Sequence, residues 1–423
     1  MSQYAVSSAP LIQVADIYQA RVRLKGVAEP TPLLYNHRLS ELYGCRVYLK
    51  REDLQVVRSY KIRGAYNKMA TLTPEQLAKG VVCASAGNHA QGVAFACHAM
   101  KVKGRIFMPS VTPQQKVRKV VGFGKDFVEV ILYGDTFDDA YAEAMQACER
   151  DGLMFVHPFD DARVIEGQGT VGAEILEDCD HPIDYVFAAV GGGGLISGVG
   201  SYFKQMSPRT RLVGVEPAGA PAMYESLRRG ELVSLEQIDN FVDGAAVRRV
   251  GALTFAIARQ VVDDMLLTPE GKVCSAILQL YNEDGIVVEP AGALAIAALE
   301  QYRDAIKGKT VVCVVSGSNN DITRTEEIKE RALLHEGLKH YFIIRFPQRA
   351  GALRDFLNHV LGPNDDITRF EYIKKHNREF GPALVGIQVE RREDCEALLT
   401  RMDQSRMNYQ SINDSRMLFD LLV

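Results

Sequence analysis

Short hydrophobic runs, glycine-containing loops and helix-like segments alternate over residues 46–316. The hydrophobic runs contain few polar residues, which is typical of parallel strands covered on both faces. The predicted strands span residues 46–50, 80–84, 105–108, 127–131, 153–156, 184–190, 212–216 and 310–315. This alternation of strand, loop and helix predicts an α/β architecture.

The pattern changes in the last quarter of the chain. Residues 323–334 form a charged, helix-like connector, and strands and long helices no longer alternate after it. We therefore predict one domain over residues 1–334 and a second over residues 335–423. The second is predicted as strand, helix, strand, strand, helix, strand, a βαββαβ order that gives an α+β domain with antiparallel pairing. The predicted apolar face of its first helix consists of Leu353, Phe356, Leu357, Val360 and Leu361.

Composition narrows the class of ligand. The 423 residues are 47% hydrophobic and carry a formal net charge of −4. A chain of this length can bury a large core, and it has no broad basic field, so we expect neither a nucleic-acid nor a membrane partner. The eight cysteines show no zinc-ligand spacing, which predicts reduced thiols and no metal site. Residues 1–15 lack a secretory signal pattern, so we expect a cytoplasmic protein that binds a small molecule.

Lys61 is the first candidate for chemistry. It lies in the segment RSYKIRGA, residues 58–65, at the start of a predicted amphipathic helix. A lysine in a first helical turn is usually a solvated surface charge. A lysine that forms a Schiff base instead needs a desolvated or cation-rich setting that lowers its pKa. We expect the helix N-terminus and the nearby Arg63 to lower the pKa of Lys61.

Three polar or glycine-rich loops follow predicted strands. They are SAGNHAQG at residues 85–92, GGGGL at residues 191–195 and SGSNN at residues 316–320. Amides at a helix N-terminus bind anions, and the carboxyl ends of strands are where open α/β sheets bind ligands. Each loop also permits a structural interpretation: a capped turn with a solvated His89, a tight strand–helix crossing at the glycines, and an ordinary turn at Ser316. The glycine loop matches neither a dinucleotide fingerprint nor a P-loop.

The four segments, taken together and in this order, resemble the fold-type II pyridoxal-phosphate enzymes, and most closely the biosynthetic threonine dehydratases (threonine ammonia-lyases). The resemblance extends over essentially the whole chain and includes TPL at 31–33, LKREDLQ at 49–55, HPFDD at 157–161 and EPAG at 289–292. It implies two open, twisted α/β lobes followed by one ACT-like regulatory domain, entered through RFPQRAGAL at 345–353. It also implies pyridoxal 5'-phosphate as cofactor. The implied reaction is dehydration and deamination of L-threonine, with L-serine as an alternative substrate, to give 2-oxobutanoate and ammonia as the first step of isoleucine biosynthesis.

The resemblance also implies roles for individual residues. Lys61 would join the cofactor covalently and later remove the Cα proton. Tyr60 would lie against the cofactor ring, Asn88 would bond the ring hydroxyl and Ser316 would face the ring nitrogen. The cofactor phosphate would be held by the amides of Gly191, Gly192, Gly193, Gly194 and Leu195. The substrate carboxylate would be held by Ser85, Ala86, Gly87, Asn88 and His89.

Two departures from relatives bear on specificity. Serine racemases of this fold carry a second serine where this chain has Ala86, so racemisation is disfavoured. Their divalent-cation site is matched by Glu216 and Ala220, but Ala222 replaces the acidic residue expected next, and we predict no metal ligand.

Regulation and assembly are further implications of the resemblance. It implies an effector such as isoleucine or valine bound through the C-terminal domain, and a homo-oligomer, tetramer or dimer. A domain that only mediates oligomer contacts is the structural alternative.

Two other functions remain open at this point. A β-replacement enzyme of the same fold, similar to cysteine synthase, would trap the intermediate with a thiol; Ala86 and the ACT-like segment count against it. A non-catalytic amino-acid sensor would keep only the fold, and the presence of Lys61 counts against that.

Overall fold

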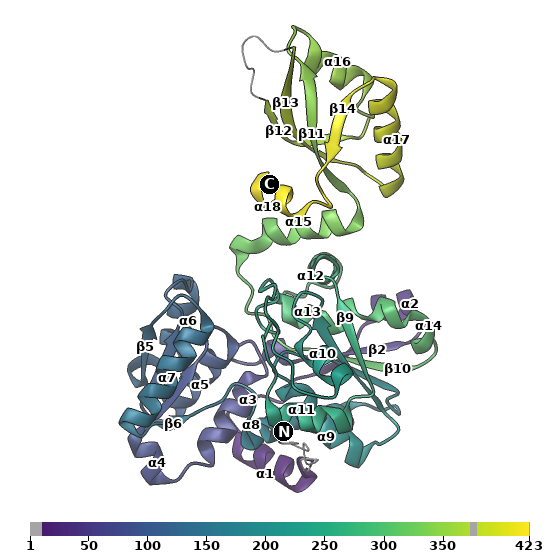
Figure 1. Cartoon of the computed structure of the whole chain (residues 1–423). Coiled ribbons are helices and arrows are strands. Elements are labelled where there is room, and N and C mark those ends of the chain that lie inside the picture. The colour runs from purple at the N-terminus through teal and green to yellow at the C-terminus, as the bar shows by residue number, and fades with distance from the viewer. Residues whose placement is uncertain (1–10, 373–378, 423) are drawn as a thin grey trace, which may run out of the picture. The chain divides into compact units, whose positions relative to one another are not determined.

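Two units make up the structure, a computed structural model that describes residues 11–372 and 379–422 (Figure 1). The division falls between Ile322 and Thr323. The first unit contains two sheets with parallel strands, and the second contains one antiparallel sheet. Residues 1–10, which belong to the segment assessed for a secretory signal, lie outside the described residues.

A six-stranded sheet forms the larger part of the first unit. Its order is β1-β2-β10-β7-β8-β9, and every neighbouring pair is parallel except β1 with β2. The strands are β1 (Leu33–Tyr35), β2 (Arg46–Arg51), β7 (Tyr185–Ala189), β8 (Arg211–Pro217), β9 (Asp264–Thr268) and β10 (Thr310–Val315). All residues of the central strands β7 and β10 are buried, as expected for strands covered on both faces.

A second sheet of the first unit has four parallel strands in the order β5-β4-β3-β6. The strands are β3 (Val81–Ala84), β4 (Gly104–Met108), β5 (Val128–Leu132) and β6 (Met154–Phe155). Helices α5, α6 and α7 pack around it (Figure 1). The two sheets form the two lobes of an α/β structure.

Within the described residues of the first unit, fourteen α-helices connect and cover these strands. They are α1 (Val14–Leu24), α2 (His37–Tyr43), α3 (Lys61–Ala70), α4 (Pro74–Lys79), α5 (Asn88–Met100), α6 (Gln114–Gly124), α7 (Phe137–Asp151), α8 (Ala162–Asp178), α9 (Gly194–Met206), α10 (Ala222–Arg229), α11 (Ala252–Val261), α12 (Glu270–Asp284), α13 (Pro290–Ala297) and α14 (Arg303–Ile306). Short 3₁₀ helices lie at Glu52–Leu54, Lys125–Phe127, Leu299–Tyr302 and Ile322–Arg324.

Close packing of α3 against α8 sets the position of Lys61. Asp161 starts α8 by accepting hydrogen bonds from two amides of the first turn, those of Arg163 and Val164. A Cβ atom on Gly167 of this helix would lie 2.5 Å from the carbonyl oxygen of Arg63. Only glycine therefore allows α3, which begins at Lys61, to approach α8 this closely.

The second unit has the predicted βαββαβ order. Its elements are α15 (Thr325–Glu336), β11 (Lys339–Pro347), α16 (Ala352–His359), β12 (Asp366–Tyr372), β13 (Phe380–Gln388), α17 (Arg392–Gln404), β14 (Asn408–Ser411) and α18 (Arg416–Leu422). Its antiparallel strands pair in the order β12-β13-β11-β14. The charged connector is α15, and α18 was not predicted.

The predicted face of α16 is only half right. Phe356 and Val360 are 1% exposed and pack into the core of the second unit. Leu353 and Leu357 are 42% and 44% exposed. The two leucines lie at the margin of the apolar stripe, and in a helix of two turns only part of such a stripe meets the sheet.

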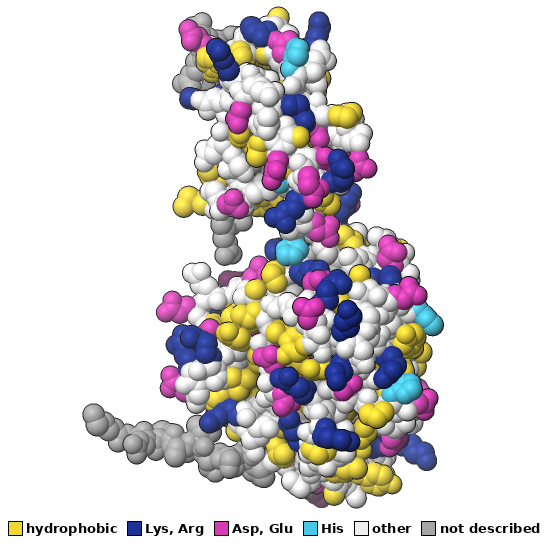
Figure 2. Space-filling model, turned by 90° about the vertical axis from the view of Figure 1, so that its right-hand side faces the viewer, with side chains coloured by type: hydrophobic (Ala, Val, Ile, Leu, Met, Phe, Trp, Pro, Cys, Tyr) yellow, Lys and Arg dark blue, Asp and Glu magenta, His cyan; other side chains and the backbone are white. Residues whose placement is uncertain are grey.

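The predicted fold class is confirmed, because each of the eight predicted strands of the first unit has a counterpart in two α/β lobes. Strands β1 and β9 were not predicted. No helix within the described residues is both long and apolar enough to span a membrane. On the face that Figure 2 presents, basic and acidic side chains are interspersed, with no extended area of a single sign.

Candidate active site

The start of α3 lies beside the loop that follows β10. The backbone N–H of Tyr60 donates to the carbonyl oxygen of Ser316 at 3.2 Å. Ser59 and Gly317 form an isolated antiparallel bridge. These contacts bring Lys61 and Ser316, which are 255 positions apart in the sequence, to one place at the carboxyl end of the six-stranded sheet.

Lys61 has an amine in a poorly hydrated setting. Its Nζ donates to the carbonyl oxygen of Pro158 at 3.0 Å. Burial lowers the pKa of Lys61 to about 8, and the carboxylate of Glu289 opposes that shift. A substantial share of the amine is therefore neutral close to physiological pH, as nucleophilic attack requires.

Arg63 does not lower the pKa of Lys61, and our expectation was wrong on this point. Its guanidinium donates to Glu52 Oε1 at 2.8 Å and to Glu174 Oε1 at 2.5 Å. Glu174 also accepts from Lys50 Nζ at 2.7 Å. All four side chains are buried, and their charges compensate one another. The cluster fastens α3 to β2 and α8, so Arg63 has a structural position behind the lysine.

The glycine loop provides amides for an anion. In the described part of the chain, the N–H groups of Gly191 to Leu195 donate to no protein acceptor. They lie at the N-terminus of α9, where the helix dipole favours negative charge. Close packing also requires glycine in this loop, since a Cβ atom on Gly192 would lie 2.2 Å from the Phe159 ring. Gly193 has φ +92°, which other residues rarely adopt.

A second turn with unpaired amides precedes α5. Ser85 Oγ accepts from the N–H of Gly87 at 3.2 Å, whereas the N–H groups of Ala86, Asn88 and His89 have no acceptor in the ranges that the structure describes. His89 is buried rather than solvated, with Nε2 2.8 Å from the carbonyl oxygen of Val156. Burial, followed by the charge of Lys61, lowers the pKa of His89 to about 3, so its ring is neutral.

Ser316 and Tyr60 line the same site as Lys61. Ser316 is 3% exposed, and its Oγ donates to the carbonyl oxygen of Ala291 at 3.2 Å. The Tyr60 ring lies with its centroid 5.3 Å from Lys61 Nζ. Burial, then the charge of Glu289, raises the pKa of Tyr60, so its phenol is neutral.

Glu289 is a site residue that the sequence reasoning missed. It lies in the EPAG segment, which was noted only as part of the family resemblance. Its Oε1 accepts from Asn88 Nδ2 at 2.6 Å. Burial, followed by repulsion from Asp243, raises the pKa of Glu289 to about 7. The sequence signal that could have pointed to Glu289 is a single carboxyl residue between Val288 and an apolar segment that forms a buried helix.

Nothing in the described residues forms a metal centre, because no cluster of three or more His, Cys, Asp or Glu side chains is arranged to hold an ion. Both oxygens of Glu216 are already engaged, since they accept from the N–H groups of Met223 and Tyr224 at 2.8 Å each.

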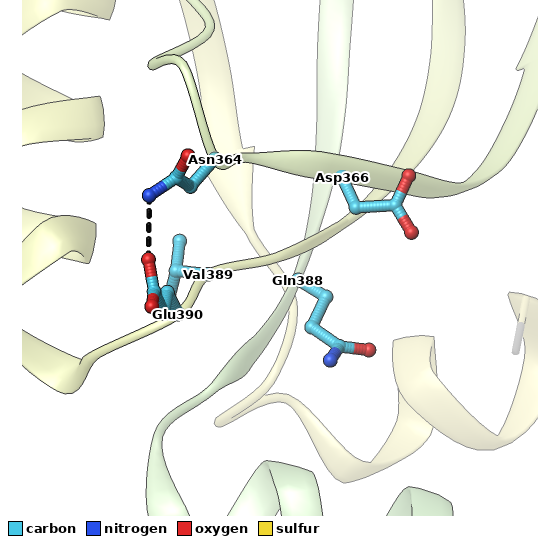
Figure 3. Close-up of a pocket in the computed structure, with 5 residues that line it drawn as sticks. All are labelled: Asn364, Asp366, Gln388, Val389 and Glu390. Atoms are coloured by element: carbon cyan, nitrogen blue, oxygen red, sulfur yellow. Dashed lines mark hydrogen bonds between the residues drawn. The ribbon is translucent and has the colours of Figure 1, made fainter.

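The second unit contains an open hollow with a volume of about 490 Å³ (Figure 3). It is lined by Asn364, Asp366, Gln388, Val389 and Glu390. Asn364 Nδ2 donates to Glu390 Oε2 at 2.5 Å. The lining is mostly polar, and two of its side chains are acidic.

Two α/β lobes that bring a partly buried lysine close to two helix N-termini with unpaired amides define a class of enzyme built to hold an anionic cofactor on a lysine. Comparison with known protein families supports this class of enzyme. Residues 24–317 match the family described as pyridoxal-phosphate dependent enzyme, and residues 330–422 match the C-terminal regulatory domain of threonine dehydratase. The chain belongs to the pyridoxal-phosphate dependent enzyme family, and its cofactor is pyridoxal 5'-phosphate.

Several relatives resemble the chain over nearly its whole length. A biosynthetic L-threonine dehydratase of Bacillus subtilis is 59% identical over 413 residues, which cover 98% of each chain. That of Halalkalibacterium halodurans is 57% identical over 412 residues, 97% of this chain and 99% of the relative. Among solved structures, threonine deaminase isoform 2 of Solanum lycopersicum gives a TM-score of 0.72 at 43% identity, covering 77% of this chain and 91% of that one.

Proposed function

We propose that this chain converts L-threonine to 2-oxobutanoate and ammonia and supplies isoleucine biosynthesis. The observation that carries the proposal is the partly buried Lys61, whose amine has a pKa lowered to about 8, among loops that offer unpaired amides. Relatives that match at least 97% of the chain are biosynthetic L-threonine dehydratases.

The residues present fit pyridoxal phosphate. The amides of Gly191 to Leu195 are suited to its phosphate, and Asn88 and Ser316 to the ring hydroxyl and the ring nitrogen. Tyr60 supplies an aromatic wall, and Lys61 supplies the amine that joins the aldehyde. The bound cofactor supplies a conjugated system that accepts the electrons of the broken Cα–H bond.

Lys61 moves the proton at the substrate Cα. Because burial disfavours its charged form, the freed amine can act as the base. The carbonyl oxygen of Pro158, 3.0 Å away, limits the directions in which the amine can point. The hydroxyl of threonine leaves as water, one water enters as ammonia leaves, and the net products are 2-oxobutanoate and ammonia.

The turn before α5 holds the substrate carboxylate. The amides of Ala86, Asn88 and His89 provide donors at a helix N-terminus. Because the His89 ring is neutral, the carboxylate binds backbone dipoles rather than a cation. Ala86 leaves this turn without the second hydroxyl of the racemases, which favours elimination over racemisation.

Residues 335–423 act as a regulatory domain and residues 1–334 as the catalytic one. We expect isoleucine or valine as the effector, a homo-oligomer and a cytoplasmic location. The match to a threonine dehydratase regulatory domain supports an amino-acid effector. The hollow in Figure 3 is a poor match for a branched aliphatic side chain, because Val389 is the one apolar residue among the five that line it.

The direct experiment is an assay of 2-oxo acid with purified protein and L-threonine, repeated with L-serine. Sulfide-dependent cysteine formation is measured in parallel, since a β-replacement enzyme would make cysteine and little 2-oxo acid. Addition of isoleucine or valine then tests regulation. Absence of 2-oxo acid from protein that carries its cofactor would refute the proposed reaction.

A further inference from the structure

The carboxamide of Asn88 is fixed by a closed ring of hydrogen bonds. Its Nδ2 donates to Glu289 Oε1 at 2.6 Å, and its Oδ1 accepts from Asn319 Nδ2 at 2.7 Å. The backbone N–H of Asn319 closes the ring by donating to Glu289 Oε2 at 3.1 Å. Glu289 is 5% exposed, so little water competes for these bonds. The three residues come from the start of α5, the N-terminus of α13 and the loop after β10.

Two groups that can only accept hydrogen bonds determine which way the carboxamide faces. Above its raised pKa of about 7, Glu289 is ionised and cannot donate, so the Asn88 atom opposite it is then nitrogen. The carbonyl oxygen of Val57 accepts from Asn319 Nδ2 at 2.8 Å, so that atom of Asn319 is nitrogen as well. The Asn88 atom that faces it must then be oxygen. Both constraints give the same orientation.

We propose that Glu289 and Asn319 are positioning residues that leave Asn88 only an N–H to offer the cofactor's ring hydroxyl. This inference rests on the proposed function, in which Asn88 binds that hydroxyl. Asn88 Nδ2 carries two hydrogens, and Glu289 takes one of them. A group that can only donate stabilises the ionised oxygen over the neutral hydroxyl. The ring of bonds therefore keeps the hydroxyl of the bound cofactor ionised.

Glu289→Gln reverses this polarity at constant size. The N–H of Asn319 still needs an acceptor, so the glutamine oxygen turns toward it and the glutamine NH₂ faces Asn88. Two donors then meet, which drives the Asn88 carboxamide to turn over. Its carbonyl oxygen would then face the ring hydroxyl and favour the neutral form. Asn319→Ala removes the group that resists this turn, so the double variant should shift furthest.

The measurement is the absorption spectrum of the lysine-bound cofactor, because the ionised ring hydroxyl absorbs in the visible and the neutral one in the near ultraviolet. Spectra are taken about one pH unit above the pKa of Glu289, which burial raises to about 7. The ratio of visible to near-ultraviolet absorbance should fall roughly tenfold in Glu289→Gln, as expected for the loss of one well-formed hydrogen bond to a charged group. Asn319→Ala should keep most of the visible band.

Two controls separate polarity from stability. Glu216→Gln alters another buried carboxylate that accepts two backbone N–H groups, and its spectrum should match the parent. Glu289→Asp keeps a side chain that can only accept hydrogen bonds, so it should keep the visible band. This variant tests the inference even if Glu289→Gln fails to retain cofactor.

The outcomes are distinguishable from failure of the proposed function. A parent protein without a lysine-bound cofactor would refute that function. A parent with the visible band, and the same band in Glu289→Gln and in the double variant, would overturn the inference. Near-ultraviolet spectra in both Glu289→Gln and Glu289→Asp would also overturn it, because loss of the visible band would then not depend on whether the side chain at position 289 can donate.

Discussion

The two units bury different kinds of side chain. Among the described residues, fully buried Lys, Arg, Asp and Glu residues lie in the first unit, among them Lys50, Arg63 and Glu289. The second unit has a core of aliphatic and aromatic groups, such as Phe342, Phe356 and Met402. Burial of a charge is costly unless a partner compensates it. The first unit therefore bears the energetic cost of burying charge, whereas the core of the second unit rests mainly on apolar packing.

The largest predicted effect on activity concerns Lys61, in the first unit. Lys61→Ala should lower kcat/KM for L-threonine at least about 10³-fold, because the variant loses both the covalent attachment and the base. Stopped assays of 2-oxo acid with saturating cofactor measure the loss. Lys339→Ala, in the second unit, is the matched control and should keep the parent rate. A Lys61→Ala rate within tenfold of the parent would mean that another amine does the work.

Arg63 tests the cost of the buried cluster. Arg63→Met should destabilise the first unit by about 3–5 kcal/mol, because Glu52 and Glu174 lose the cation between them, and Lys50 pairs with Glu174 but not with Glu52. Urea unfolding followed by a signal from the first unit measures the change.

The control is Arg391→Met, which removes the exposed ion pair with Asp394 in the second unit. This variant should unfold at the parent urea concentration, since exposed pairs contribute little. Equal effects of the two variants would remove the distinction between the units.

Phe356 provides the corresponding test in the apolar core of the second unit. Phe356→Ala should destabilise the second unit by about 3–5 kcal/mol through the cavity it leaves. Basal 2-oxo acid production should persist, while the response to isoleucine or valine should weaken. Leu357→Ala is the control, because that side chain is 44% exposed and its removal leaves no cavity. Loss of basal activity in Phe356→Ala would show that catalysis depends on the second core.

The smallest effect is the pH dependence of cofactor attachment. Only the neutral amine attacks the aldehyde, and burial lowers the pKa of Lys61 to about 8. The attachment rate of cofactor-free protein should therefore rise about tenfold per pH unit below that value and level off above it. Absorbance changes after mixing follow the rate. A rise that continues to about pH 10, where an ordinary lysine titrates, would contradict the burial of this amine.

Sequence patterns predicted the lobes well, because parallel strands covered on both faces are continuously apolar, as in β7 and β10. Strand β1 has three residues at an antiparallel edge, and β9 begins with Asp264, so neither carries a strong pattern. Leu353 and Leu357 belong to the predicted apolar face but are exposed, because periodicity defines a stripe and not its buried width.

The site was predictable only in part. Lys61, Asn88 and Ser316 each follow a local pattern, but the bridge between Ser59 and Gly317 that unites two of them is a tertiary contact. Arg63 was assigned to the chemistry because it is two positions from Lys61, yet its guanidinium faces Glu52 and Glu174. Glu289 lies in the EPAG segment, but its bonds to Asn88 and Asn319 are tertiary contacts that no local pattern shows.

Reduction of the cofactor-loaded protein with borohydride, followed by peptide mapping, tests the central claim most directly. The account predicts that one modified peptide is recovered and that it carries the reduced cofactor on Lys61. Recovery of the label on any other lysine, or of an unmodified Lys61 peptide from protein that has bound cofactor, would contradict it.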